Sequence, residues 1–150
     1  MASPRIPSAP NSNALFARGL AAVLVPVVIA LGLACKLYSG PAATFVNNYG
    51  PASVAYVWLW MLLAFVVWPE RKWIVRIAVV VFVATCLIEF LQLWKHGILE
   101  TVRATFLGKM VLGNSFSWWD FPAYLVGCLS GYWILSACCS FKTISRDQKS

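Results

Sequence analysis

Residues 86–94 read C-L-I-E-F-L-Q-L-W, an apolar run that carries Glu89 and Gln92. Two residues three positions apart on a helix share a face, so these two polar side chains are expected on the same side. A carboxylate inside a hydrophobic run is costly and is usually paired or functional. The stretch therefore indicates a membrane helix that carries a polar site.

The composition of the whole chain also indicates a membrane protein. The 150 residues are 61% hydrophobic and 11% charged, whereas a soluble domain is about half apolar and about a quarter charged. Eight tryptophans and five tyrosines supply rings that favour membrane interfaces. The chain has a net charge of +7, but no basic stretch of its sequence is interleaved with exposed aromatic residues. The charge therefore predicts contact with anionic lipid rather than with nucleic acid.

Four apolar runs approach the roughly 20 residues that cross hydrocarbon as a helix. The predicted spans cover residues 19–37, 52–68, 73–94 and 121–141. The sequence thus predicts an all-α, integral membrane four-helix bundle formed by residues 19–141. Residues 1–18 are expected to form a disordered cytoplasmic tail, and residues 142–150 a basic one.

The loop between the third and fourth predicted spans is long for a helix connection, and long loops are often functional. Leu99, Val102, Phe106 and Met110 recur in it at helical spacing. This pattern predicts a short amphipathic helix that lies in the membrane interface.

Lysine and arginine are unevenly divided between the two sides of the predicted bundle. One side collects Arg5, Arg18, Arg71, Lys72, Arg76, Lys142, Arg146 and Lys149. The other side collects Lys36, Lys95, Arg103 and Lys109. The positive-inside rule then places both termini in the cytoplasm and the long loop outside.

Several polar residues are expected at the depth of Glu89. Asp120 opens the fourth span, Tyr124 follows one helical turn later, and Arg103 lies in the preceding loop. The predicted cluster comprises Glu89, Gln92, Arg103, Asp120 and Tyr124. Further contributors are His96 and Lys109 near the same loop, and Asn47 and Asn48 of the first outward loop.

Three interpretations of this cluster remain open. The cluster can be a hydrogen-bonded staple between helices, in which Arg103 neutralises a carboxylate. It can bind a lipid headgroup or a small polar molecule, because a guanidinium matches phosphate bidentately. It can serve a hydrolase or transferase, with Glu89 as general base. Neither a nucleophile motif nor a metal-ligand set is recognised, so the sequence assigns no catalytic residue, cofactor or metal.

Two glycines, Gly127 and Gly131, form G-x-x-x-G in the last span. Small residues at this spacing let helices approach closely. We expect them to pack inside the bundle, with homodimerisation as the alternative. The five cysteines lack metal-ligand spacing and are interpreted as small apolar side chains.

Four stretches of the chain carry a family resemblance. They are G-P-A-A-T-F-V-N-N-Y-G at residues 40–50, L-I-E-F-L-Q-L-W at 87–94, T-V-R-A-T-F-L-G-K-M-V-L-G at 101–113 and F-S-W-W-D-F-P-A-Y-L-V-G at 116–127. In these stretches the chain resembles a bacterial family of small membrane proteins, domain of unknown function 2809, often found in cyanobacteria. The resemblance implies a membrane protein of four to five helices.

The chain also bears a more distant resemblance to VanZ-like proteins. Those share a Glu-x-x-Gln on one helix, a following Arg, and an Asp that opens a glycine-bearing helix. The matching positions here are Glu89, Gln92, Arg103, Asp120, Gly127 and Gly131. VanZ-like proteins are linked to resistance to lipid-targeting glycopeptide antibiotics, and this link points to envelope lipids or cell-wall precursors.

The sequence therefore favours a non-enzymatic membrane protein whose outward polar site binds a lipid headgroup or an envelope precursor. One alternative is a structural or accessory subunit of a larger membrane complex. Another is a membrane-embedded hydrolase or transferase that acts on a lipid-linked substrate. The expected partners are membrane lipids and other membrane subunits, in a bacterial plasma membrane or a thylakoid.

Overall fold

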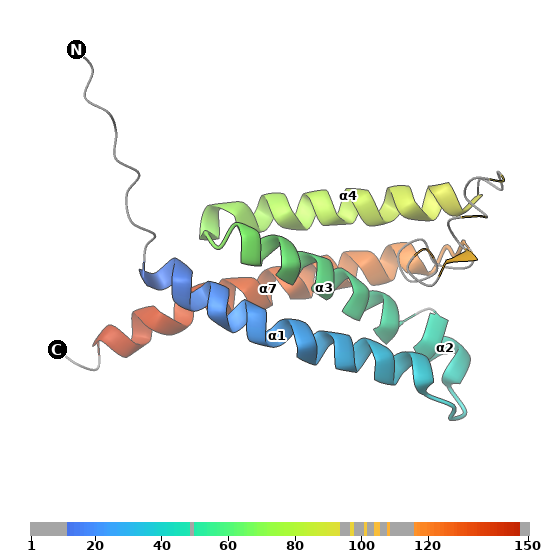
Figure 1. Cartoon of the computed structure of the whole chain (residues 1–150), viewed down its shortest axis with the longest axis horizontal. Coiled ribbons are helices and arrows are strands. Elements are labelled where there is room, and N and C mark those ends of the chain that lie inside the picture. The colour runs from blue at the N-terminus through green and yellow to red at the C-terminus, as the bar shows by residue number, and fades with distance from the viewer. Residues whose placement is uncertain are drawn as a thin grey trace, which may run out of the picture.

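The computed structural model describes residues 12–48, 50–93 and 116–147, together with residues 97, 101, 104, 105 and 108. All regular elements of these residues are helical (Figure 1). They are α1 (Ser12–Leu37), α2 (Ala43–Asn48), α3 (Pro51–Val67), the 3-10 turn η1 (Arg71–Trp73), α4 (Ile74–Leu93) and α7 (Asp120–Asp147). The predicted all-α bundle of four long helices is confirmed.

Within the part of the chain that the structure describes, three stretches are long and apolar enough, by length and composition, to cross a membrane. These are Asn13–Leu37, Arg71–Leu93 and Asp120–Ser140. Helix α3 is apolar as well but has 17 residues, slightly fewer than the roughly 20 that span hydrocarbon upright. In the third loop, the described residues 97, 101, 104 and 108 have helical backbone, as the apolar spacing of this loop predicts.

The outermost helices extend into both predicted tails. Helix α1 begins at Ser12 rather than at residue 19, because Ala14, Leu15 and Ala17 are strong helix formers next to the apolar run. Helix α7 continues to Asp147, since no glycine or proline interrupts its last turns. Both outer helices therefore include residues that the sequence analysis assigns to the tails.

Proline residues set the ends of α3. Pro51 occupies the first turn of this helix, where its fixed φ suits the helix and its missing N–H is not needed. At the other end, the Trp68 N–H still bonds to the Ala64 carbonyl at 3.0 Å. Pro69 then follows and disfavours the helical conformation of the residue before it. The short turn that results brings α4 back along α3.

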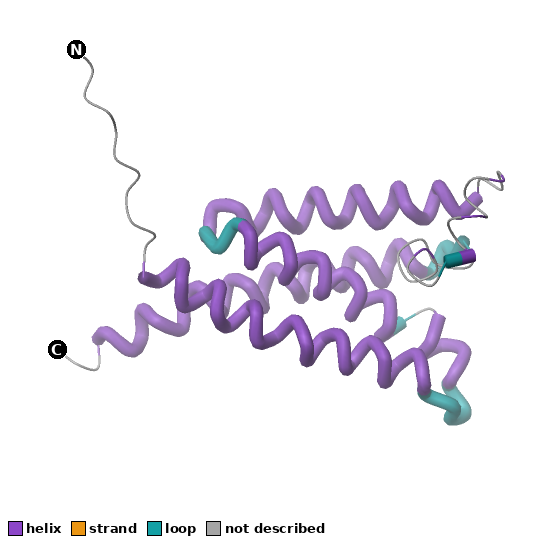
Figure 2. The backbone as a smooth tube through the Cα atoms, in the orientation of Figure 1, coloured by secondary structure: helices purple, strands orange, loops and turns teal. Residues whose placement is uncertain are grey.

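Helix α3 lies at the centre of the bundle, where it contacts α1, α4 and α7. Its Val57, Met61 and Phe65 are almost fully buried, and their four-residue spacing places them on one face. The start of α1, the α3–α4 turn and the end of α7 lie at one end of the bundle (Figures 1 and 2). The end of α4, the start of α7 and the short α2 lie at the other.

The outward faces of the long helices are apolar too. Val23 on α1, Val80 on α4 and Trp133 on α7 are 65%, 65% and 72% exposed. A helix that is hydrophobic all round belongs in the core of a large protein or in a membrane. Since the bundle is a single layer of helices around α3, these faces indicate a membrane protein.

Candidate functional site

The candidate site lies at the end of the bundle where α4 ends and where α3 and α7 begin (Figure 1). Among the described residues, the buried polar or charged side chains are Thr85, Glu89, Gln92 and Asp120. All of them except Thr85 belong to the predicted site. Tyr124 is buried beside them. We refer to Glu89, Gln92, Asp120 and Tyr124 as the polar cluster.

Glu89 lies at the centre of the polar cluster and is 2% exposed. Its Oε1 accepts a hydrogen bond of 2.5 Å from the Tyr124 hydroxyl and one of 3.2 Å from Nε2 of Gln92. Its Oε2 accepts a longer bond of 3.5 Å from the backbone N–H of Ser117. The carboxyl group therefore joins α4 both to α7 and to the segment that precedes α7.

Asp120 is held by a different helix. The Ser53 hydroxyl, in the first turn of α3, donates a hydrogen bond of 2.7 Å to Oδ1 of Asp120. Lys36, in the last turn of α1, acts electrostatically on the Asp120 carboxyl, and the Glu89 carboxyl is a side-chain hydrogen-bond partner of Asp120. The polar cluster thus links α3, α4 and α7 directly and is influenced by a cation of α1.

The polar cluster has spare capacity to accept hydrogen bonds. Oε1 of Gln92 is buried and meets no donor within the described part of the chain. A carboxylate can accept about four bonds, and the Asp120 carboxyl receives a single hydrogen bond from the described side chains outside the cluster, that of Ser53. An unmet buried acceptor costs about 1–3 kcal/mol. A hydroxyl, ammonium or guanidinium group placed here would therefore be stabilised.

Several residues of the predicted site lie wholly or partly outside the part of the chain that the structure describes. Arg103, His96 and Lys109 lie outside the described residues. Asn47 and Asn48 form the end of α2, at the same end of the bundle as the polar cluster (Figure 1). The side chains of both asparagines are outside the described part.

Two contacts of the polar cluster are not predicted from sequence. Ser53 lies near the start of the second predicted span, on the same side of the membrane as Asp120, and this shared depth is the signal that could identify it. Ser117 contributes its backbone N–H. Every residue other than proline has this donor, so the residue type does not reveal the contact.

Gly127 and Gly131 face α3. A Cβ atom at Gly127 would lie 2.9 Å from Cβ of Val57, and one at Gly131 would lie 2.6 Å from Sδ of Met61. Real Cβ contacts are longer than this, so a side chain at Gly127 would push the helices apart and one at Gly131 would displace the end of the Met61 side chain. The two glycines therefore let α7 approach α3 closely, just beyond the polar cluster.

The arrangement offers hydrogen-bond acceptors rather than a metal centre. Among the described residues, no three His, Cys, Asp or Glu side chains gather closely enough to hold a metal ion. The hydroxyls next to the carboxyls, those of Ser53 and Tyr124, donate to them. What the geometry supports chemically is the binding of a group rich in donors.

A family model described as Protein of unknown function (DUF2809) matches residues 42–128. The chain belongs to this family. The match takes in α2, α3, η1, α4 and the first turns of α7. All four residues of the polar cluster and their partner Ser53 therefore fall within the DUF2809 segment, while α1 and its Lys36 lie outside it. No solved structure matches the chain significantly.

Proposed function

We propose that this DUF2809 protein binds the headgroup of a membrane lipid or of a lipid-linked envelope precursor at the polar cluster, without catalysing a reaction. The observation that carries the proposal is the buried Oε1 of Gln92, which meets no donor in the described part of the chain. Nε2 of the same side chain donates to Glu89, and Asp120 supplies the second buried carboxyl of the cluster. A ligand that supplies hydroxyl or amine hydrogens would satisfy these acceptors.

The depth of the polar cluster suits a headgroup. Glu89 precedes the last residue of α4, Leu93, by four positions, which is about 6 Å along a helix. Trp118 and Trp119, next to Asp120, are 72% and 69% exposed. Exposed tryptophans favour the headgroup level of a bilayer. A lipid already in the membrane could therefore reach the cluster from the side.

Arg103 is proposed as the contact to a phosphate of the same headgroup. The sequence places it between Gln92 and Asp120, in the loop that joins α4 to α7. Its guanidinium would bind phosphate oxygens bidentately, while the polar cluster accepts hydrogens from the hydroxyl or amine part. In this proposal Arg103 and the polar cluster bind different parts of one headgroup, and neither carries out a covalent step.

The test is lipid retention by the Gln92→Leu variant, measured by native mass spectrometry of protein extracted in mild detergent. We expect the wild type to keep a bound lipid and the variant to lose at least about tenfold in occupancy, which corresponds to one or more hydrogen bonds. Leucine removes the unmet Oε1 of Gln92 but also the Nε2 donor to Glu89. Because these two effects on stability oppose each other, the thermal unfolding midpoint should stay close to that of the wild type.

Thr85→Val is the matched control, since Thr85 is equally buried but bonds to the Val81 carbonyl of its own helix. This control should keep the lipid. If Gln92→Leu retains lipid like the wild type, or loses it only together with a marked drop in stability, the cluster is a structural staple and the proposal is wrong. An Arg103→Gln variant that keeps the lipid with unchanged affinity would remove the phosphate contact from the proposal.

A further inference from the structure

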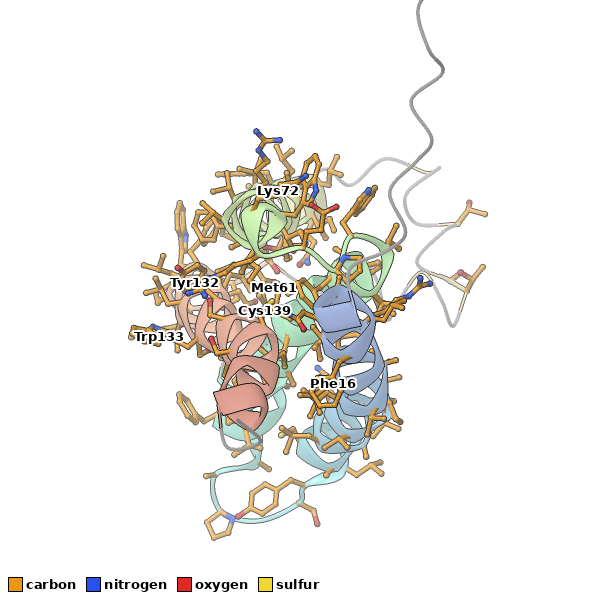
Figure 3. All side chains as sticks on the ribbon, turned by 90° about the vertical axis from the view of Figure 1, so that its left-hand side faces the viewer. Phe16, Met61, Lys72, Tyr132, Trp133 and Cys139 are labelled. Atoms are coloured by element: carbon orange, nitrogen blue, oxygen red, sulfur yellow. The ribbon has the colours of Figure 1, made fainter. Side chains whose placement is uncertain are left out.

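The opposite end of the bundle holds a cavity that is unrelated to the polar cluster. The cavity measures about 350 Å³ and is lined by Asn13 and Ala14 of α1, residues 69–72 of the α3–α4 turn, and Cys139 of α7. Figure 3 looks onto this end, with Lys72 and Cys139 labelled. We propose that this cavity binds the phosphate of an anionic glycerophospholipid.

The charges around the cavity favour an anion. Lys72 pairs with Glu70 at 2.6 Å, and both side chains remain largely exposed. Arg71 has no carboxylate within ion-pair distance among the described residues. Its guanidinium is therefore available to a phosphate, which it matches bidentately. The lining as a whole carries one more positive than negative charge.

The start of α1 adds to this positive potential. Helix α1 has 26 residues and no acidic residue in its first turn, so no side chain of that turn neutralises its positive dipole end. The first turn supplies Asn13 and Ala14 to the cavity wall. A phosphate beside Arg71 would face this helix end as well as the side chain.

Aromatic residues place the cavity at headgroup depth. Trp68 and Trp73 flank the turn, with ring centroids 6.5 Å apart. The Arg76 guanidinium lies 4.8 Å from the Trp73 ring. Tryptophans with neighbouring arginines are typical of the membrane interface. A lipid phosphate is present at that depth at high local concentration, and this favours a lipid over a soluble anion as the occupant.

The experiment compares binding of phosphatidylglycerol and phosphatidylcholine to the full-length protein in neutral detergent, by native mass spectrometry. The test variant is Arg71→Gln, and the matched control is Arg18→Gln, which removes the same charge from the exposed first turns of α1 outside the cavity lining. A surface charge near a membrane contributes about fivefold in affinity for anionic lipid. We expect the loss in phosphatidylglycerol affinity to exceed about tenfold for Arg71→Gln and to stay within about fivefold for Arg18→Gln.

A second variant, Ala14→Phe, fills the cavity without changing charge. It should weaken phosphatidylglycerol binding as Arg71→Gln does, while phosphatidylcholine binding and the unfolding midpoint stay unchanged. Equal losses in Arg71→Gln and Arg18→Gln would show general electrostatic attraction and overturn the site. Inorganic phosphate that binds as tightly as phosphatidylglycerol would overturn the lipid as occupant. Gln92→Leu should leave this binding intact, which separates the cavity from the polar cluster.

Discussion

Glu89 and Asp120 are buried carboxyl groups at the same end of the bundle, and they are held by different hydrogen-bond donors. Glu89 receives hydrogen bonds from Tyr124, from Gln92 and from a backbone N–H. Asp120 receives one from Ser53. A buried acceptor that loses its donor keeps the cost of desolvation. The stability of the cluster therefore depends most on the donors that approach Glu89.

Tyr124→Phe should destabilise the protein by about 1–2 kcal/mol, because it removes the shortest of the hydrogen bonds to Glu89 and leaves the aromatic ring in place. The measurement is the free energy of unfolding in detergent. Tyr132→Phe is the matched control, since Tyr132 lies on the same helix with its ring 38% exposed. Equal stability of the two variants would mean that the hydroxyl of Tyr124 does not support Glu89.

The sequence predicts which side chains belong to the polar cluster better than it predicts the contacts between them across helices. Helical geometry predicts that Glu89 and Gln92 share a face of one helix, and they are hydrogen-bonded there. It also predicts that Tyr124 follows Asp120 by one helical turn, and the Tyr124 hydroxyl donates to Glu89. The bond between Ser53 and Asp120 depends on how α3 is rotated against α7. That rotation is decided by the packing of the whole helices, which residue identity does not reveal.

Helices α3 and α7 are joined by a close contact that begins at Gly127. A hydrogen bond from Trp58 to Ser130, of 2.9 Å, ties the same two helices one turn further along. In a membrane, small residues and such interhelical bonds replace the hydrophobic effect as the source of helix association. The G-x-x-x-G pattern is visible in the sequence, but the choice of α3 as its partner needs the three-dimensional arrangement.

Gly127→Ala should destabilise the bundle by about 1–3 kcal/mol, because the new methyl group would lie 2.9 Å from Cβ of Val57. Gly19→Ala, in α1, is the control, since its Cβ would meet nothing within 4 Å. It should leave stability unchanged or raise it by up to about 1 kcal/mol. Thermal unfolding in detergent compares the two. A neutral Gly127→Ala would show that α3 and α7 can separate without cost.

The helix ends are where sequence patterns predict least. Proline marks both ends of α3 clearly, and the sequence places this helix to within a residue. Helices α1 and α7 have no such signal at their outer ends, and their polar last turns resemble tails in composition. Helical hydrogen bonds continue there because each added residue extends an existing helix at little cost.

On the scale of the whole molecule, the two ends of the bundle differ in chemistry. One end gathers the buried carboxyls Glu89 and Asp120. The other carries Arg71, Lys72 and Arg76 around the α3–α4 turn and Arg18 near the start of α1. Apolar helices connect these ends. By the positive-inside rule, such a distribution predicts one direction of the bundle across a membrane.

The basic end should therefore face the cytoplasm, with the start of α1 and the end of α7 on the same side. A fluorescent protein fused after Ser150 should fold and fluoresce, and alkaline phosphatase fused there should be inactive. Phosphatase inserted at Gly40, in the turn between α1 and α2, should be active instead, because that turn lies at the opposite end (Figure 1). Substituting Arg71, Lys72 and Arg76 by glutamine should reduce this difference, since the positive charges set the orientation. Active phosphatase after Ser150 in the unaltered chain would contradict the four-span arrangement with a cytoplasmic basic end, and would move the polar cluster to the cytoplasmic leaflet.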